Sequence, residues 1–239
     1  MIVLPAMTEA QEQAWRALLD LYEAHPEEWT LIGGQMVHLH CAERGYAPLR
    51  PTTDADAVVN AREPQVLGRV TAALTEMGFE PGRPSADGIQ HRWTRGAAVV
   101  DVLVPEGLSE KAGKRVSASG FPTVAAPGGT QALNRSEVVE VQVGGRVGQV
   151  RRPVLLSAMI MKAAARLETY GAGLERHCYD FAVLAAMLAS GDTAAFDLTT
   201  KDKKRLRRMI ERTRALPEAL EQNPTAERRL ERLEALIGS

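Results

Sequence analysis

The chain has 239 residues, enough for one large domain or two small ones, and its near balance of 29 basic and 30 acidic side chains means that any contact with nucleic acid must be local. Its two cysteines, Cys41 and Cys178, form no Cys-x-x-Cys pair, which argues against a zinc knuckle or a disulfide framework and favours the reducing cytoplasm. The N-terminus has no signal-peptide pattern, and no run of about 18 apolar residues predicts a membrane span.

The first predicted helix begins at a capping box formed by Thr8 and Gln11. Its apolar side chains share one face, as in ordinary core packing: Trp15, Leu18, Leu19 and Tyr22. A short apolar strand follows and ends at Gly33 and Gly34, which open a predicted helix over 35–43. Free N–H groups at the start of this helix could hold the β- and γ-phosphates of a nucleotide, although a double glycine is often only a tight turn.

Two carboxylates come next, in the segment from Arg50 to Asp56 that reads Arg-Pro-Thr-Thr-Asp-Ala-Asp. Because Asp54 and Asp56 are two residues apart, both project from one face if they lie on a strand. At about 4 Å they would repel by roughly 4 kcal/mol at an effective dielectric constant near 20, so keeping both ionised needs a counter-charge. Mg²⁺ suits this need because it favours one or two carboxylates together with substrate phosphates. The alternative is a solvated strand edge.

In this order, the paired glycines and the segment 50–56 resemble the Gly-Gly … Arg-x-Thr-x-Asp-x-Asp signature of the polymerase β-like nucleotidyltransferase superfamily. The resemblance implies an α+β fold, with a mixed sheet and flanking helices followed by a C-terminal helical domain. It also implies a role for each residue of the signature. Asp54 and Asp56 would ligate metal, Gly33 and Gly34 would hold phosphates, and Arg50 and Thr52 would brace the loop or touch phosphate.

The next predicted elements are a helix and a hairpin. The helix starts at Pro64 and ends at Gly78, with an apolar stripe made of Leu67, Val70, Leu74 and Met77. The hairpin turns near Gly96 and joins residues 89–93 to an apolar strand over 97–104. A mixed sheet is therefore expected.

Asp101 stands in the middle of that apolar strand. The superfamily has a third carboxylate on a neighbouring strand, so the resemblance implies that Asp101 ligates metal or acts as the base for the attacking hydroxyl. An unpartnered buried acid is costly, so the other interpretation is an Asp101 that an arginine or backbone donors satisfy. His91 or Arg92 could point towards the metal site, but a surface or core pair is the simpler interpretation.

Two further segments could approach the site. Residues 106–119 include three basic side chains and are expected to form a loop or short helix over it. Residues 127–131, Pro-Gly-Gly-Thr-Gln, could approach a nucleotide through their backbone but more simply form a turn into a strand.

A second hairpin and a change of pattern mark the predicted domain boundary. Apolar and polar side chains alternate over 138–143 and again over 146–150, and a pair of glycines separates the two runs. This pattern predicts the hairpin. From Pro153 onward the pattern is helical, so we predict a catalytic domain over 1–152 and a helical domain over 153–239.

The first two helices of the helical domain are predicted to pack against each other. One carries Lys162 near the end of an apolar stripe, Gly171 and Gly173 break it, and the next carries Asp180. Packing as a hairpin could bring Lys162 and Asp180 together. They could form a stabilising ion pair. Alternatively, Lys162 neutralises triphosphate charge in the transition state while Asp180 positions it or accepts a proton.

Lys162 followed by Arg176-His177-x-x-Asp180-Phe181 resembles the C-terminal signature of the AbiEii/AbiGii-type nucleotidyltransferase toxins, although His177 stands where many relatives have an acid. With the earlier motifs, the resemblance spans about residues 30 to 190. It implies an NTP substrate, Mg²⁺ and a cognate antitoxin as partner. In studied branches of the family it implies transfer of nucleotides to the acceptor end of tRNA.

Residues 201–214 hold eight basic and two acidic side chains, which suits a phosphate backbone. Leu206, Met209 and Ile210 would face the body of the protein, so an amphipathic helix with a solvated basic face is the alternative. A final amphipathic helix could cap the core or contact a partner; its apolar residues are Leu230, Leu233 and Ile237.

The sequence therefore predicts an Mg²⁺-dependent nucleotidyltransferase that acts on a hydroxyl acceptor, most readily tRNA in a toxin role. A small-molecule enzyme of the aminoglycoside-resistance kind would share the acidic core, but the basic segment 201–214 weighs against it. A non-catalytic nucleotide-binding protein of the same fold is the third hypothesis. The presence of all the expected charged residues weighs against it: Asp54, Asp56, Asp101 and Lys162.

Overall fold

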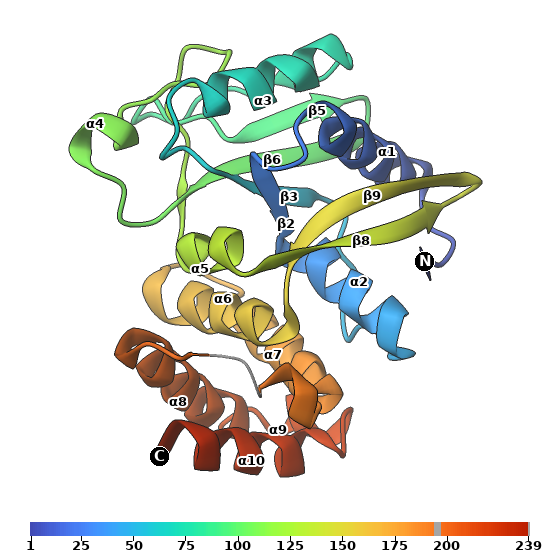
Figure 1. Cartoon of the computed structure of the whole chain (residues 1–239), viewed down its shortest axis with the longest axis vertical. Coiled ribbons are helices and arrows are strands. Elements are labelled where there is room, and N and C mark those ends of the chain that lie inside the picture. Colours follow the sequence, from blue (N-terminus) through green and yellow to red (C-terminus); the bar gives the residue numbers. More distant parts are fainter. Residues whose placement is uncertain (194–196, 239) are drawn as a thin grey trace.

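The protein is described by a computed structural model over residues 1–193 and 197–238. Its larger sheet has the strand order β2-β3-β6-β5-β4, and β7 pairs with β6 (Figure 1). The strands are β2 (Trp29–Ile32), β3 (Ala55–Val59), β4 (Glu80–Pro81), β5 (Arg92–Arg95), β6 (Ala98–Pro105) and β7 (Ala125–Ala126). β3 runs antiparallel to β2 and parallel to β6, so the prediction of a mixed sheet is confirmed.

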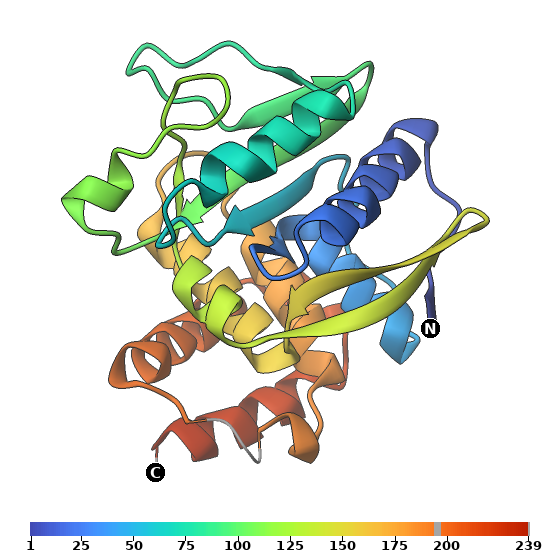
Figure 2. The same ribbon diagram turned by 45° about the horizontal axis from the view of Figure 1, so that its top comes forward.

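A second, three-stranded sheet contains β1 (Ile2–Val3), β8 (Ser136–Val143) and β9 (Arg146–Pro153). The predicted hairpin is confirmed, and both of its strands are longer than predicted. Figure 2 shows this hairpin running alongside α1 (Glu9–Ala24). β1 was not predicted, because two residues are too few to show an alternating pattern.

Helices cover both sides of the strands (Figure 1). α1 and α3 (Val66–Glu76) lie on one side, and α2 (Gly33–Arg44), α5 (Gly129–Asn134) and α6 (Leu155–Glu168) lie on the other. The remaining long helices continue from α6: α7 (Arg176–Met187), α8 (Thr200–Arg214) and α10 (Ala226–Gly238). Short elements complete the chain: α4 (Glu110–Gly113), a 3₁₀ turn (Ser190–Asp192) and α9 (Pro217–Glu221). The α+β fold with a C-terminal helical part is as predicted.

Several local predictions need correction. α3 begins at Val66 rather than at Pro64, because Gln65 has a left-handed backbone (φ 68°) that a helix cannot include. The segment 127–131 leads into α5, not into a strand. β5 begins at Arg92, three residues later than predicted. The capping box at Thr8 and the short helix within 106–119 are confirmed.

The largest cluster of buried apolar side chains runs from the strands and α1 into α6, α7, α8 and α10. β9 ends at Pro153 and α6 begins at Leu155, close to the proposed boundary at residue 152. Because one core continues across this point, the division into two domains stays a prediction. Both cysteines are free and buried. Among the described helices, none combines the length and the apolar character that a bilayer span requires.

α8 is amphipathic as predicted, with Leu206, Met209 and Ile210 buried. Its basic residues do not all face solvent, however. Arg205 is buried and donates hydrogen bonds to Glu168 of α6 at 2.6 and 3.0 Å, and to Glu106 at 3.3 Å. The simple count of basic residues over 201–214 therefore overstates the charge that α8 offers to a partner.

Replacing Arg205 by alanine should lower the free energy of unfolding by about 2–4 kcal/mol, because Glu168 and Glu106 lose a buried counter-charge. Urea unfolding of the full chain measures this loss. Arg208→Ala, at an exposed position of the same helix, is the matched control and should change the value by no more than about 0.5 kcal/mol. Equal losses in the two variants would show that the buried network contributes nothing particular.

Candidate functional site

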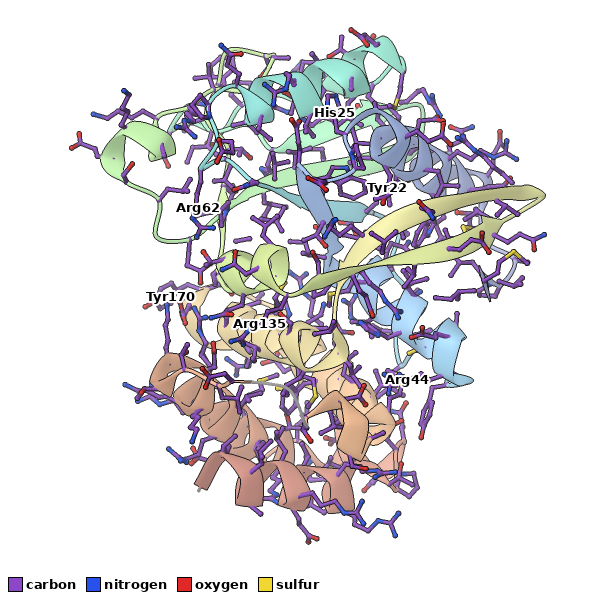
Figure 3. The ribbon with its side chains drawn as sticks, in the orientation of Figure 1. Tyr22, His25, Arg44, Arg62, Arg135 and Tyr170 are labelled. Atoms are coloured by element: carbon purple, nitrogen blue, oxygen red, sulfur yellow. The ribbon has the colours of Figure 1, made fainter. Side chains whose placement is uncertain are left out.

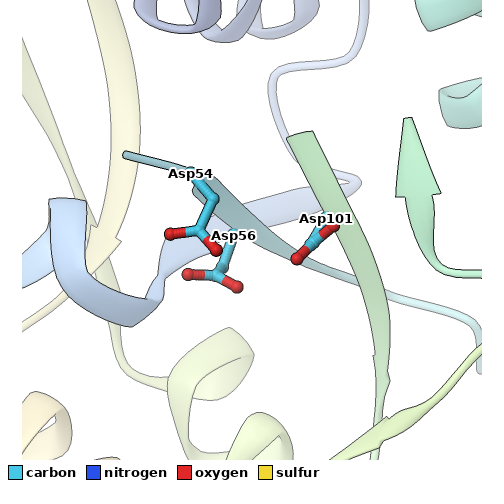
Figure 4. A group of neighbouring side chains, drawn as sticks. All are labelled: Asp54, Asp56 and Asp101. Carbon is cyan, nitrogen blue, oxygen red and sulfur yellow. The ribbon is translucent and has the colours of Figure 1, made fainter. Parts of the chain in front are cut away.

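Three carboxylates meet on neighbouring strands of the larger sheet. Asp56 of β3 is in register with Asp101 of β6, and Asp54 immediately precedes β3. One oxygen from each of the three lies within 4.8 Å of the others. Figure 4 shows the three side chains as one group. Hard carboxylate oxygens grouped in this way are the ligands that Mg²⁺ takes in proteins, so the donor set fits the expected metal.

The paired glycines run directly against this acidic cluster. Ile32 of β2 is in register with Asp56, so the chain enters α2 beside that carboxylate. A Cβ on Gly33 would lie 1.8 Å from Asp56 Oδ2, and Gly33 also has a φ of +70°. A Cβ on Gly34 would lie 2.4 Å from Thr52 Oγ1, which itself donates a hydrogen bond to Asp54 Oδ1 at 3.2 Å. The two glycines therefore do more than make a turn: they let the start of α2 approach the carboxylates.

A cavity of about 330 Å³ opens beside the cluster. Its polar part is made by α2 and the residues around it and includes Gly33, Gly34, Arg50, Thr52, Asp54, Asp56 and Lys162. The rest of its wall is largely apolar and includes Leu103, Val124, Ala126, Met161 and Ala165. Tyr170 also lines the cavity, with 98% of its surface exposed, and Figure 3 shows it near the end of α6. A polar end joined to an apolar wall is the usual form of a small-ligand site.

Lys162 and Asp180 are brought together by α6 and α7, as the helix-hairpin prediction required. Lys162 Nζ lies 2.7 Å from Asp180 Oδ2, and both side chains are buried. Arg50 donates two hydrogen bonds to the same carboxylate, at 2.9 and 2.7 Å. Burial alone would raise the pKa of Asp180, but Lys162 and Arg50 hold it below its ordinary value. The ion-pair interpretation therefore describes the contact that the structure shows.

Lys162 and Arg50 line the cavity, whereas Asp180 is not among the described residues that do so. A ligand in the cavity would thus meet Asp180 only through these two basic side chains. Its contacts with both cations agree with the positioning role that the sequence offered for Asp180, and its catalytic role stays a prediction.

Asp101 is paired with Arg92, its direct cross-strand neighbour on β5. Arg92 donates from Nε to Oδ1 at 2.9 Å and from Nη2 to Oδ2 at 2.7 Å. Nη2 also lies 3.6 Å from Asp54 Oδ2. An arginine partner was one of the two interpretations of Asp101 that the sequence left open, and the structure has it. Of His91 and Arg92, it is Arg92 that contacts the acidic cluster.

Arg176 and His177, at the start of α7, also line the cavity, although neither was singled out as a site residue. Burial lowers the pKa of His177 to about 3, with Lys162 and Arg176 adding to the effect. Its buried Nδ1 has no hydrogen-bond partner among the described residues. Helical spacing could have revealed both, because they precede Asp180 by four and three residues and so share its face of the helix. No sequence signal marked Tyr170.

Asp56 is the carboxylate that the protein leaves least compensated. Burial raises its pKa to about 7, and the neighbouring charges of Asp54 and Asp101 add to this rise. Lys162 and Arg176 oppose it only in part. Near neutral pH, full ionisation of the cluster therefore favours an added cation.

No protein-family model and no curated protein matches the chain. Among solved structures, it is similar to the solution structure of the antibiotic-resistance factor ANT(2'')-Ia. The two are 13% identical, the match covers 89% of this chain and 97% of the other, and the TM-score is 0.46. A likeness at this level carries no argument about function, which therefore depends on the geometry of the site.

Asp56→Asn should make the metal-free protein more stable at pH 8. The folded-state pKa of Asp56 is about 7, well above its ordinary value near 4, so the parent loses stability as pH rises between these two values. The variant has no proton to lose, and the gain at pH 8 should be on the order of 2–4 kcal/mol. Urea unfolding in EDTA at pH 5 and pH 8 measures it.

The control is Asp87→Asn, at an exposed loop position. It should show no such gain, and added Mg²⁺ should stabilise the parent but not Asp56→Asn. The raised pKa of Asp56 would be contradicted if the difference in free energy of unfolding between the parent and Asp56→Asn were the same at pH 5 and at pH 8.

Proposed function

We propose that this protein is a divalent-metal-dependent nucleotidyltransferase that moves NMP from an NTP to a hydroxyl acceptor. One observation carries the proposal: the start of α2, Asp54 and Asp56 of the acidic cluster, and Lys162 line a single cavity. A triphosphate needs backbone N–H donors, a basic side chain and a metal ion: the start of α2 and Lys162 supply the first two, and Asp54 and Asp56 would hold the third.

In this proposal the triphosphate lies at the polar end of the cavity. The N–H groups that begin α2 and the Nζ of Lys162 bind phosphate oxygens, while Asp180 and Arg50 keep Lys162 in place. Mg²⁺ held by Asp54 and Asp56 would neutralise the carboxylates and polarise the phosphate. The apolar wall and Tyr170 receive the ribose and base.

The transfer is an in-line displacement at the α-phosphorus. Asp101 accepts the proton of the acceptor hydroxyl, whose oxygen forms a bond to the α-phosphorus. The bond from this phosphorus to the bridging oxygen breaks, and pyrophosphate leaves with the electron pair. Lys162 stabilises the negative charge that grows on the phosphate oxygens.

The acceptor that the surface supports best is an RNA end, most readily that of tRNA. Lys201 lies 3.7 Å from Glu168 at the end of α6, two residues before Tyr170, so α8 begins close to the mouth of the cavity. Exposed basic side chains then follow along α8: Lys204, Arg207, Arg208 and Arg212. A toxin role and a cognate antitoxin belong to the same hypothesis and depend on the family resemblance alone.

Purified protein incubated with Mg²⁺, total tRNA and each α-³²P-labelled NTP in turn should transfer label to RNA. Asp54→Asn and Lys162→Met should lower the rate by about 100-fold or more, because each removes charge stabilisation of the transferring phosphate. Asp87→Asn, an exposed carboxylate change, should leave the rate unaltered.

Other outcomes of this assay distinguish the alternatives. Label on an added aminoglycoside and never on RNA would indicate the small-molecule enzyme. NTP binding without transfer to any acceptor, including protein, would indicate a non-catalytic nucleotide-binding protein.

The double variant Lys204→Glu with Arg208→Glu should weaken tRNA binding. Each lost phosphate contact should reduce the steepness of the log affinity against log salt plot by roughly 0.7. Fluorescence anisotropy at several salt concentrations measures this slope. Arg228→Glu with Arg232→Glu makes the same charge change at exposed positions of α10, and an equal effect there would contradict a specific role for α8.

A further inference from the structure

The contact between Arg92 and Asp101 differs from the other ion pairs of the site in its exposure. The Arg92 side chain is 48% exposed and that of Asp101 only 7%. Arg92 occupies both oxygens of Asp101, and it also lies 3.6 Å from Asp54. The guanidinium therefore stands on the solvent side of Asp101 and covers it.

The three carboxylates also differ in their relation to the cavity. Asp54 and Asp56 line it, whereas neither Asp101 nor Arg92 is among the described residues that do. The three carboxylates are nevertheless close enough to share ions, since their nearest oxygens lie within 4.8 Å. Asp54 and Asp56 are thus open to the cavity, whereas Asp101 lies outside its lining and is paired with Arg92.

We propose that Arg92 is a removable counter-ion of Asp101 that divides the acidic cluster into an open metal site and a guarded one. Asp54 and Asp56 form the open site, which takes one divalent ion while Arg92 remains in place. Asp101 joins in binding a second ion only after the guanidinium turns away. This inference rests on the proposed function, because it assumes that the cluster binds metal.

Arg92 is suited to this role by its position on β5. Its backbone is fixed by the pairing of β5 with β6, whereas its long side chain is half exposed and can turn without breaking the sheet. Asp101 gains a bidentate, charge-assisted pair in the absence of metal, which offsets the repulsion from Asp54 and Asp56. A second metal ion would replace that positive charge, so Arg92 and the ion compete for the same two oxygens.

The same cover also applies to Asp101 as a base. Both of its oxygens accept hydrogen bonds from Arg92, so neither is free to take the proton of an acceptor hydroxyl until the pair opens. The open site can hold a nucleotide and its metal before that step. Nucleotide binding and activation of the acceptor are therefore separable events in this site.

The test counts the Mn²⁺ ions that bind the full chain at pH 8, by electron paramagnetic resonance of free Mn²⁺ and by calorimetry. The parent should bind one ion tightly. Arg92→Gln should bind two, with the second at least about tenfold tighter than in the parent. Two ions a few ångströms apart should also broaden the low-temperature spectrum of the bound Mn²⁺. Arg92→Lys keeps the positive charge but loses the two parallel hydrogen bonds of the guanidinium, so its affinity for the second ion should lie between those of the parent and Arg92→Gln.

A matched control distinguishes the direct pairing of Arg92 with Asp101 from the loss of any positive charge near the cluster. Arg176→Ala also removes one positive charge that acts on Asp56, but Arg176 has no contact with Asp101 in the described structure. It should tighten the first ion modestly and add no second one. Asp101→Asn in the Arg92→Gln background should remove the second ion. Thermal melts with and without Mn²⁺ verify that each variant is folded.

The inference is overturned if the parent already binds two ions, or if Arg92→Gln and Arg176→Ala alter binding equally. In either case metal binding by Asp54 and Asp56, and with it the proposed function, would stand. The absence of Mn²⁺ binding by the folded parent and by every variant would overturn both.

Discussion

The hydrogen-bond register of β2, β3 and β6 sets the position of everything at the site. Ile32 of β2 pairs with Asp56 of β3, and Asp56 pairs in turn with Asp101 of β6. The turn into α2 therefore meets the acidic cluster, which is why only glycine fits at Gly33. A shift of one residue in either pairing would turn one partner to the opposite face of the sheet and separate these groups.

Charge balance decides which of the site residues remains available to a ligand. Asp180 is satisfied by Lys162 and Arg50, and Asp101 is satisfied by Arg92. Asp56 has no such close partner among the described residues, and its burial, with the neighbouring charges of Asp54 and Asp101 adding to the effect, raises its pKa to about 7. A site of this kind stores unfavourable charge in the folded state, which a bound cation relieves. Near neutral pH this charge lowers the stability of the fold in the absence of a bound cation.

The helical part of the chain completes the site that the strands begin. α6 carries Lys162 and α7 carries the residues facing it, so the polar end of the cavity lies between the sheet and these two helices. Arg205 then links α8 to the end of α6 through Glu168 and reaches Glu106 beyond β6. These contacts hold α8 against the end of α6, two residues before Tyr170 of the cavity lining.

The sequence by itself determined the elements whose chemistry is local. The glycine pair, the Asp-x-Asp spacing, the apolar strand around Asp101 and the period of α8 are each visible within a few residues, and the structure has each of them. Spacing also predicted the contact between Lys162 and Asp180, because a short glycine turn leaves two helices little choice but to pack together.

Only the tertiary structure decided which charged residues pair and which remain open. Arg92 and Arg50 had several possible partners in the sequence, and strand register and helix packing chose Asp101 and Asp180. Burial of Arg205 likewise depended on acids 37 and 99 residues away. Such choices depend on distances between segments that are far apart in the chain, and local periodicity contains no information about those distances.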